Sequence, residues 1–495
     1  MMSFFSANSQ VRLTNSNLLS QAAFVAGNWV DQAQADKTFD VLNPSTGELI
    51  ATLPDLGVTE TKTAINAAYV AQKDWAAITG KDRGGVLRQL FDLMIANADD
   101  LAAILTAEMG KPLAEAKGEI LYGASYVEWF SEEAKRVYGD IIPGHQADKR
   151  IMVLKQPVGV VASITPWNFP IAMIARKLAP ALAVGCAFVA KPADETPLSA
   201  LALAVLAEQA GVPKGLLSII TSKSSSAIGQ EFCSNSQVRK LTFTGSTEVG
   251  RILMKQSADQ VMKTSMELGG NAPFIVFDDA DLDAAVEGAM ISKYRNNGQT
   301  CVCANRIYVQ AGVYDAFAQK LSAALNKMKV GDGFADGVTA GPLINEEAVL
   351  KVIEHVDDAK AQGAKVIVGG KRHALGGTFF EPTILTGVKR SMKIADEETF
   401  GPIAPLFKFD TVEDVIAQSN DTIFGLASYF YATDLAKVWR VAEALEFGMV
   451  GVNTGLISTE VAPFGGIKQS GQGREGSKYG VDDYLETKYI CVGGL

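Results

Sequence analysis

Histidine and cysteine are scarce in this chain of 495 residues. The three histidines lie far from one another and from any cysteine pair, which excludes the common zinc-binding patterns, and we predict no metal site. The five cysteines are odd in number and mostly far apart, so they form no disulfide framework and suit a reducing compartment. A cysteine hydrolase that works without a cofactor needs a histidine beside its cysteine, and none of the three histidines is placed for this role. Hydrolysis of a simple ester stays open as a secondary activity.

Long apolar runs and basic runs are missing as well. The longest apolar span, Leu178 to Ala190, is broken by Pro180 and is too short to cross about 30 Å of hydrocarbon. Residues 1–17 contain no basic segment followed by an apolar one, so we expect no signal peptide. The net charge of −10 argues against a nucleic-acid partner. We therefore expect a cytoplasmic protein that binds neither membranes nor nucleic acids.

Short strand-like runs alternate with helical segments from residue 158 onward. The first alternation extends to about residue 243, and a second one starts near residue 272 and continues to about residue 455. Buried strands that alternate with helices are typical of a parallel sheet covered on both faces, and such sheets bind ligands at the carboxyl ends of their strands. The predicted fold class is α/β, with two doubly wound, Rossmann-like parallel sheets and a small β arm.

The predicted domains follow from these changes of pattern. Short strands precede a long helical region before residue 138, and the tail alternates like an exposed strand. Such a strand could pair with another subunit, because an unpaired edge is a liability, or it could close its own domain. The expected units are a dinucleotide-binding domain, a catalytic domain and an oligomerisation arm, at residues 1–138 with 157–263, at residues 264–460, and at residues 139–156 with 480–495.

Cys301 is the candidate nucleophile. It follows Gly298, which lets the backbone approach closely, and polar residues surround it. A thiolate is a strong nucleophile that can hold a covalent intermediate, but a free cysteine is also among the most buried residue types. Cys303 lies two positions further on and could form a strained, reversible disulfide with Cys301 as a redox switch.

Two further residues could serve the same chemistry. Asn168 follows a predicted strand, where its amide could donate to a developing oxyanion or cap the next helix. Glu267 stands beside two glycines between the two alternating regions and is a candidate general base, with an ordinary exposed glutamate as the alternative.

Strand ends in the first region also suggest a nucleotide site. Lys191 and Asp194 could hold a ribose, or they could belong to a solvated loop. Gly245 and Ser246 open a helix whose free N–H groups suit a pyrophosphate, although a serine N-cap explains the pattern nearly as well.

Taken together, these segments resemble the aldehyde dehydrogenase superfamily over nearly the whole chain. The segments Thr-Pro-Trp-Asn-Phe-Pro, Phe-Thr-Gly-Ser-Thr-Glu-x-Gly, Glu-Leu-Gly-Gly, Gly-Gln-x-Cys and Glu-Glu-x-Phe-Gly-Pro occur in order. The resemblance implies catalytic roles for Cys301, Glu267, Asn168 and Lys177. It also implies a nicotinamide cofactor held by Pro166, Trp167, Lys191, Asp194, Gly245, Ser246, Glu398 and Phe400. The intact catalytic set argues against a catalytically silent binding protein.

Within the superfamily the chain resembles the succinate-semialdehyde dehydrogenases at Arg176, Arg295 and Ser458. In that subfamily these side chains hold the substrate carboxylate, and an arginine fork suits a carboxylate. The resemblance implies oxidation of succinic semialdehyde to succinate through a Cys301 thioester, by a homodimer or homotetramer. Another ω-carboxy aldehyde, such as glutaric semialdehyde, is the alternative substrate.

The expected cofactor is NAD, with NADP as the alternative. Asp194 can accept a hydrogen bond from a ribose 2′-hydroxyl and would repel a 2′-phosphate. Lys223 stands in a loop where relatives usually carry glycine, and it could reach a phosphate and reverse this preference.

Overall fold

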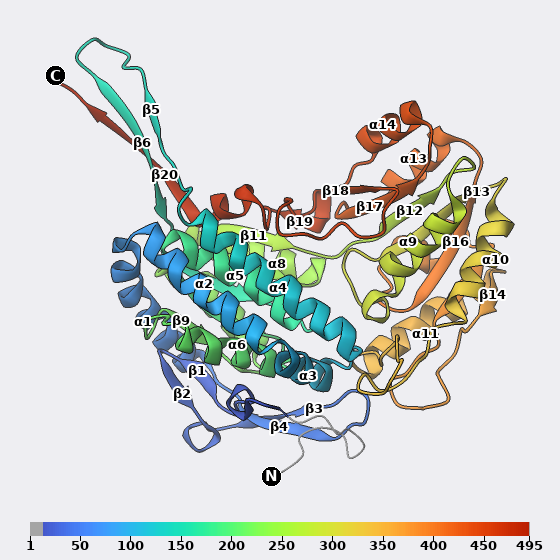
Figure 1. Ribbon diagram of the computed structural model, residues 1–495, viewed down its shortest axis with the longest axis horizontal. Helices are drawn as coiled ribbons and strands as arrows, with labels where there is room; N and C mark the ends of the chain where they lie inside the picture. Colours follow the sequence, from blue (N-terminus) through green and yellow to red (C-terminus); the bar gives the residue numbers. More distant parts are fainter. Residues whose placement is uncertain (1–12, 495) are drawn as a thin grey trace.

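Two mainly parallel β-sheets and a projecting three-stranded arm make up the fold (Figure 1). The computed structural model describes residues 13–494. Strands alternate with helices in both sheets, so the predicted α/β class with two doubly wound sheets is confirmed.

The first sheet has the strand order β19-β11-β10-β7-β8-β9-β1-β2. Its five central strands run parallel, and β1, β2 and β19 add antiparallel edges. The side chains of β8 are buried throughout, because helices cover both faces of the sheet. The strands are β1 (Ala23–Val25), β2 (Asn28–Val30), β7 (Val160–Ile164), β8 (Ala187–Lys191), β9 (Leu217–Ile219), β10 (Val238–Thr244), β11 (Lys263–Glu267) and β19 (Gly471–Gln472).

Within the described residues, eight α-helices accompany this sheet. Four of them lie between β2 and β7 in the chain, where the sequence predicted a helical region, and four connect the parallel strands. They are α1 (Val58–Ala77), α2 (Gly80–Ala96), α3 (Ala98–Met109), α4 (Leu113–Glu133), α5 (Pro170–Val184), α6 (Pro197–Gln209), α7 (Ser225–Ser234) and α8 (Thr247–Ser257).

The second sheet has the strand order β14-β15-β16-β13-β12-β17-β18, and only the β14–β15 pair is antiparallel. Its strands are β12 (Ala272–Val276), β13 (Ala304–Gln310), β14 (Lys365–Val368), β15 (Thr383–Thr386), β16 (Ile403–Phe409), β17 (Ala427–Tyr431) and β18 (Met449–Val452). Its helices are α9 (Leu282–Tyr294), α10 (Tyr314–Leu325), α11 (Glu346–Ala361), α12 (Lys393–Asp396), α13 (Val412–Asn420) and α14 (Leu435–Ala444).

The arm consists of β5 (Asp140–Ile142), β6 (Arg150–Pro157) and β20 (Leu485–Val492). Strand β20 pairs with β6 antiparallel over its whole length, so the tail joins its own chain's arm. The arm extends away from both sheets, and its outer strand β5 is exposed (Figure 1). Two further strands, β3 (Thr38–Leu42) and β4 (Leu49–Pro54), form a separate hairpin.

The chain crosses between the two sheets later than the domain boundary predicted at residue 263. Strand β11 still belongs to the first sheet and ends at Glu267, and β19 returns to that sheet from the far end of the chain. The crossing segment is therefore residues 268–271. Among the residues that the structure describes, none of the helices combines the length and apolar character needed to cross a membrane.

Strand register explains why distant segments meet. Ile164, Lys191, Phe243 and Met266 end or nearly end neighbouring parallel strands and lie side by side in the first sheet. On the opposite side, strands β12, β13 and β16 of the second sheet begin directly after the Gly-Gly, Cys301 and Phe400 segments. The carboxyl edge of the first sheet thus faces segments at the amino edge of the second. The sequence had predicted ligand binding at the carboxyl ends of strands, and it did not predict the contribution of the amino edge.

Candidate active site

Cys301 lies on the turn between the short 3-10 helix η4 (Arg295–Gly298) and β13, and it lines two cavities at once. The first cavity encloses about 270 Å³. Besides Cys301 it is lined by Pro166, Trp167, Asn168, Met173, Thr244, Gly245, Ser246, Leu268, Gly269, Lys351, Glu398 and Phe400. The second cavity is much narrower and is lined by Tyr122, Phe169, Met173, Arg176, Arg295, Thr300, Val302, Ser458 and Phe464. The cysteine therefore stands where two distinct ligands could meet.

A tight backbone packing shapes the turn before Cys301. Gly298 has φ +78°, and a Cβ there would overlap the carbonyl group of Gly401. The buried Gln299 side chain accepts a hydrogen bond from the Ile344 N–H at 2.9 Å and donates one to the Asn296 carbonyl at 3.2 Å. The turn is thus fixed to neighbours on both sides, so the sulfur has a defined position.

Asn168 approaches this turn from the first sheet. Its Nδ2 donates to the Gln299 carbonyl at 3.1 Å, and its buried Oδ1 has no hydrogen-bond partner among the described residues. Phe169 is the N-cap of α5, and the structure records no side-chain capping bond there, so the alternative role of Asn168 as a helix cap does not hold. The second Nδ2 hydrogen is left for a ligand in the Cys301 cavity.

A buried ion pair holds the backbone of Asn168. Lys111 Nζ donates to the Asn168 carbonyl at 2.7 Å and to Glu119 Oε2 at 2.6 Å, and both side chains are about 1% exposed. Glu119 Oε1 in turn accepts the first free N–H groups of α5, from Ile171 at 3.0 Å and Ala172 at 3.2 Å. Lys111 and Glu119 thereby connect α4 with the start of α5.

The surroundings of Cys301 favour the protonated thiol in the free protein. Burial raises its pKa to about 12, and the nearby Arg176 guanidinium only partly opposes this shift. Because the thiolate is the reactive form, the site needs a proton acceptor or a further positive group before the sulfur can react.

Glu267 ends β11 and is buried, but it lines neither cavity. Its Oε2 has no hydrogen-bond partner among residues 13–494. Burial, together with the negative charge of Glu475, raises the pKa of Glu267 well above its usual range. A carboxyl group with a raised pKa and a free oxygen has the properties of a general base that works near neutral pH.

Arg176 and Lys177 are both ion-paired with Glu475, a residue that sequence analysis did not select. Lys177 also donates to Thr244 Oγ1 at 2.6 Å and lines neither cavity. Arg176 does line the narrow cavity, but part of its charge is already neutralised by Glu475. Lys177, predicted to be catalytic, and Arg176, predicted to bind substrate, thus share the buried carboxylate of Glu475.

Arg295 differs from Arg176 in its surroundings. Its guanidinium lies over the rings of Phe169 and Tyr122, at 4.9 and 5.9 Å from the ring centres. Within the part of the chain that the structure describes, Arg295 has no ion pair with a carboxylate. Ser458 lines the same narrow cavity. This cavity therefore offers a guanidinium near Cys301 that has no direct ion pair among the described residues, and the Glu115 carboxylate is a negative group that interacts with it from further away.

The predicted cofactor residues fall into two groups. Pro166, Trp167, Gly245, Ser246, Glu398 and Phe400 all line the Cys301 cavity. Lys191 is buried at the end of β8, donates to the Pro192 carbonyl at 3.1 Å and does not line it. Asp194 lines a separate cavity of about 550 Å³, together with Lys223.

Ser246 and Glu398 show how this cavity is built. Ser246 caps α8 by accepting the Val249 N–H at 3.3 Å, so the N-cap interpretation holds while Ser246 still faces the cavity. Glu398 Oε1 accepts the Gly270 N–H at 3.2 Å, and burial raises the pKa of Glu398 to about 7. A Cβ on Gly269 would lie 2.7 Å from Glu398 Oε2, so a side chain at this position would displace the Glu398 carboxylate.

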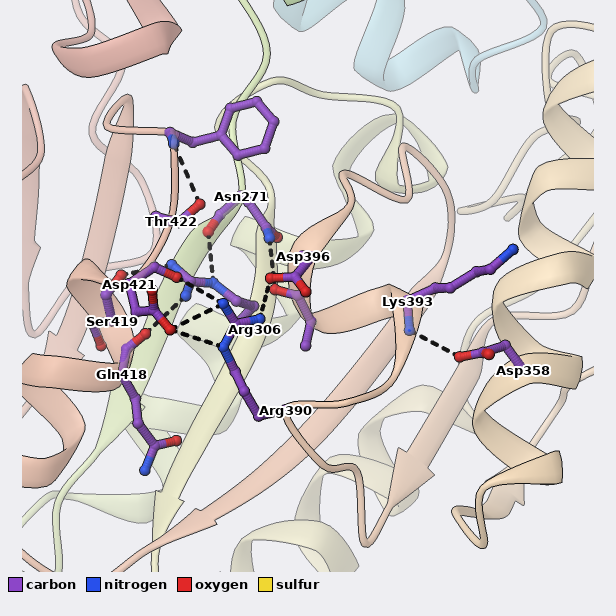
Figure 2. A network of polar contacts seen from close by, with 12 residues as sticks. Asn271, Arg306, Asp358, Arg390, Lys393, Asp396, Gln418, Ser419, Asp421 and Thr422 are labelled. Atoms are coloured by element: carbon purple, nitrogen blue, oxygen red, sulfur yellow. Dashed lines mark hydrogen bonds and ion pairs between the residues drawn. The ribbon is translucent and has the colours of Figure 1, made fainter.

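The segment that carries Glu398 is anchored by a polar network in the second sheet (Figure 2). Asn271 Nδ2 donates to the Ala395 carbonyl at 3.1 Å, and the buried Arg306 donates to the Asn271 carbonyl at 3.0 Å. Arg390 joins Asp396 to Asp421 through its guanidinium. The network ties the Glu398 segment to the residues that follow Gly270.

Cys303 is fully buried and lies against the Lys293 carbonyl, with Sγ 3.5 Å from that oxygen. Both Cys301 and Cys303 are free thiols in this structure. The redox switch remains a prediction. No group of three or more potential ligand side chains within residues 13–494 is arranged to hold a metal ion.

Sequence analysis missed Glu475, Lys111 and Glu119. A readable signal existed only for Glu119, which stands on the apolar stripe of α4 between the buried Ala116 and Ile120. A glutamate in such a place must find a buried partner. Nothing local marks Glu475, whose partners lie about 300 residues earlier in the chain.

A doubly wound sheet with a cavity at the carboxyl ends of its strands is the architecture of dinucleotide-dependent oxidoreductases. The sequence profile of the aldehyde dehydrogenase family matches residues 29–490, and the chain belongs to this family. The predicted family and enzyme class are confirmed.

Two relatives and one solved structure show how close the similarity is. The chain is 65% identical over 485 residues to glutarate-semialdehyde dehydrogenase of Pseudomonas aeruginosa, which covers 98% of this chain and 100% of the relative. It is 62% identical over 483 residues to succinate-semialdehyde dehydrogenase [NADP(+)] GabD of Escherichia coli, with 98% and 100% covered. The crystal structure of succinate-semialdehyde dehydrogenase from Burkholderia pseudomallei superposes with a TM-score of 0.96 at 62% identity, covering 98% of this chain and 100% of that one.

Proposed function

We propose that this enzyme oxidises succinic semialdehyde to succinate with NAD(P) as hydride acceptor. The observation that carries the proposal is the unpaired Arg295 guanidinium in the narrow cavity that Cys301 also lines. An aldehyde with a carboxylate at its far end would place the anion on Arg295 and the carbonyl carbon near the sulfur. The names of the two relatives support an ω-carboxy aldehyde as substrate.

Glutaric semialdehyde is the second candidate, since the Pseudomonas aeruginosa relative is named for it. Comparing kcat/KM for the four- and five-carbon semialdehydes decides between them. A higher value for the five-carbon substrate would reverse the assignment.

The chemistry begins at Cys301. Its sulfur attacks the aldehyde carbon, and the Asn168 amide hydrogen stabilises the resulting oxyanion. Because burial raises the pKa of the Cys301 thiol to about 12, its proton must be released to solvent before the sulfur can attack. Loss of hydride from the tetrahedral carbon then leaves a thioester on Cys301.

Release of the acid needs an activated water. Glu267 serves this step as general base once its side chain turns toward the sulfur, which its unpartnered Oε2 leaves free to happen. Lys177 and Arg176 act indirectly, because their positive charges and that of Glu475 set the electrostatic surroundings of Glu267.

The first of the two cavities that Cys301 lines has groups that suit a dinucleotide. The start of α8 offers free N–H groups for a pyrophosphate, the Glu398 carboxylate can accept from ribose hydroxyls, and bare backbone at Gly269 permits close approach. When bound, the nicotinamide accepts the hydride. Pro166, Trp167 and Phe400 form the apolar wall, with the Trp167 and Phe400 rings edge-on at 5.5 Å.

We infer a preference for NAD over NADP from Asp194, whose carboxylate would repel a 2′-phosphate. Lys223 lines the same cavity and opposes this preference, as does the NADP(+) in the name of the Escherichia coli relative. Lys223→Ala should raise, and Asp194→Ala should lower, the ratio of kcat/KM for NAD to that for NADP. Opposite shifts would reverse the assignment.

The arm is proposed to join subunits of a homodimer or homotetramer. Its outer strand β5 is exposed and carries Ile141 at 86% exposure. Light scattering of the purified enzyme measures the mass, and a monomer would contradict the proposal.

The test of the substrate class is Arg295→Met. A charged hydrogen bond contributes roughly 1.5–3 kcal/mol, so kcat/KM for succinic semialdehyde should fall about 10- to 100-fold or more. The matched control is butanal, an aldehyde of the same length without the carboxylate, whose kcat/KM should stay within about threefold. Equal losses for both aldehydes would refute a carboxylate-binding role.

A further inference from the structure

His355 lies on α11 beneath the Glu398 segment, and no step of the proposed mechanism uses it. The imidazole is fully buried, with 0% exposure. Its Nδ1 is 3.1 Å from Thr399 Oγ1, and its Nε2 is 3.2 Å from Glu397 Oε2. The two partners are the residues immediately before and after Glu398. One side chain therefore holds the residues on both sides of Glu398, whose carboxylate faces the first Cys301 cavity, the proposed cofactor cavity.

The protonation state of this histidine follows from its partners. Burial lowers the pKa of His355, which keeps the ring neutral. The Glu397 carboxylate can only accept, so Nε2 must carry the proton and donate to it. Nδ1 is then the acceptor, and the buried Thr399 hydroxyl must donate to it. Each partner thus engages a different nitrogen, and neither can be exchanged for the other.

Other parts of the protein anchor the Glu398 segment before and after the two residues that His355 contacts. Helix α11 accepts the Lys393 N–H at Asp358 Oδ2, 2.8 Å away, and Asn271 and Arg390 hold Ala395 and Asp396 from the other side (Figure 2). Beyond Asp396, Glu398 Oε1 accepts the Gly270 N–H and the Pro402 carbonyl accepts the Thr383 N–H at 2.8 Å, while His355 contacts the side chains of Glu397 and Thr399. Phe400 has φ +52°, an uncommon conformation for a residue with a side chain, which persists only where the surroundings impose it.

We propose that His355 is a positioning residue that sets the Glu398 carboxylate in the cofactor cavity by holding Glu397 and Thr399 in place. The inference rests on the proposed cofactor role of Glu398. It assigns the cofactor-binding strength of this enzyme to a histidine outside both cavities.

The test compares four variants with the wild-type enzyme: His355→Leu, His355→Asn, Thr399→Val and the control His373→Gln. His355→Leu removes both contacts, and its KM for the cofactor should rise about 5- to 30-fold while KM for the aldehyde changes less than twofold. His355→Asn keeps a polar atom near the Nδ1 position and should recover part of the loss. Thr399→Val should reproduce much of it. His373 lies in a surface loop and donates to none of these residues, so its variant should match wild type.

A double variant separates positioning from a general structural role. If His355 acts through Glu398, His355→Leu should have little further effect on cofactor KM in a Glu398→Gln background. Full additivity, or equal rises in cofactor KM and aldehyde KM, would overturn the inference. If His355→Leu fails to fold, His355→Asn and Thr399→Val carry the same comparison.

The two proposals fail in different ways. An unchanged cofactor KM in Glu398→Gln would overturn the cofactor role of Glu398 and this inference with it. A raised cofactor KM in Glu398→Gln, combined with an unchanged one in both His355→Leu and Thr399→Val, would overturn the inference alone.

Discussion

Replacing Lys111 with methionine tests how the enzyme holds Asn168, the proposed oxyanion donor. Lys111→Met removes both the 2.6 Å ion pair with Glu119 and the 2.7 Å hydrogen bond to the Asn168 carbonyl. Breaking a buried ion pair typically costs about 3–5 kcal/mol, because the remaining charge is left buried. Glu119 still accepts two N–H groups from α5, so we expect a loss near the lower end, ~3 kcal/mol.

An exposed ion pair of the same length provides the control. Lys117 Nζ and Asp99 Oδ1 are also 2.6 Å apart, but the two side chains are 49% and 84% exposed. Lys117→Met should therefore cost no more than about 1 kcal/mol. Chemical denaturation of both variants, followed by fluorescence, compares the two losses directly.

The kinetic consequence separates position from stability. Without Lys111 the Asn168 segment loses an anchor, and the displaced amide should slow hydride transfer about 10- to 100-fold. Complete removal of an oxyanion donor costs more, roughly 2.7–4 kcal/mol, which corresponds to a rate loss of about 10²- to 10³-fold. Stopped-flow measurement of the first turnover, below the unfolding transition, reports this rate. The reasoning is refuted if Lys111→Met is as stable as Lys117→Met, or if its first turnover is as fast as that of wild type.

Three further outcomes are expected. Glu267→Gln should give one fast burst of reduced cofactor and then stall, because the thioester forms but is not hydrolysed; steady turnover without a burst would contradict the base assignment. The raised pKa of Cys301, about 12, predicts that alkylation of the free enzyme by iodoacetamide accelerates up to at least pH 10, and a plateau near pH 8 would show that the thiol ionises earlier. The pKa of Glu398, raised to about 7, means that its carboxylate is neutral below this pH and ionised above it, so cofactor KM should fall between pH 6 and pH 8 in wild type and stay flat in Glu398→Gln.

The sequence could point to Cys301 and Asn168, which the structure brings to one cavity, because each stands in a short, local segment. Cys301 and Asn168 are 133 residues apart in the chain, but each directly follows or precedes an element with a clear pattern. The two segments meet because the carboxyl edge of the first sheet faces the amino edge of the second, where Asn168 donates to the Gln299 carbonyl. The fold class followed for the same reason, since the alternation of buried strands and helices is written in local hydrophobicity.

Contacts between distant polar side chains were not predictable in this way. Arg176 carries the residue type of a carboxylate ligand, and only the folded chain shows that Glu475 already pairs with it. Asp194 and Lys191 are three positions apart, but the structure turns Asp194 into a cavity that Lys191 does not line. Side-chain direction at a strand end depends on the packing of the following loop.

The amino-acid sequence by itself determined the two-sheet architecture, the family and the residue that carries the sulfur, because these depend on periodicity and on short runs of neighbouring residues. Only the tertiary structure decided which charges are left free near that sulfur, since a buried charge is neutralised by whichever partner the fold brings within a few ångströms. The same holds for the neutral side chain of His355. Its place in α11 looks ordinary in the sequence, and its two hydrogen-bond partners become visible only when residues 397 and 399 fold against it.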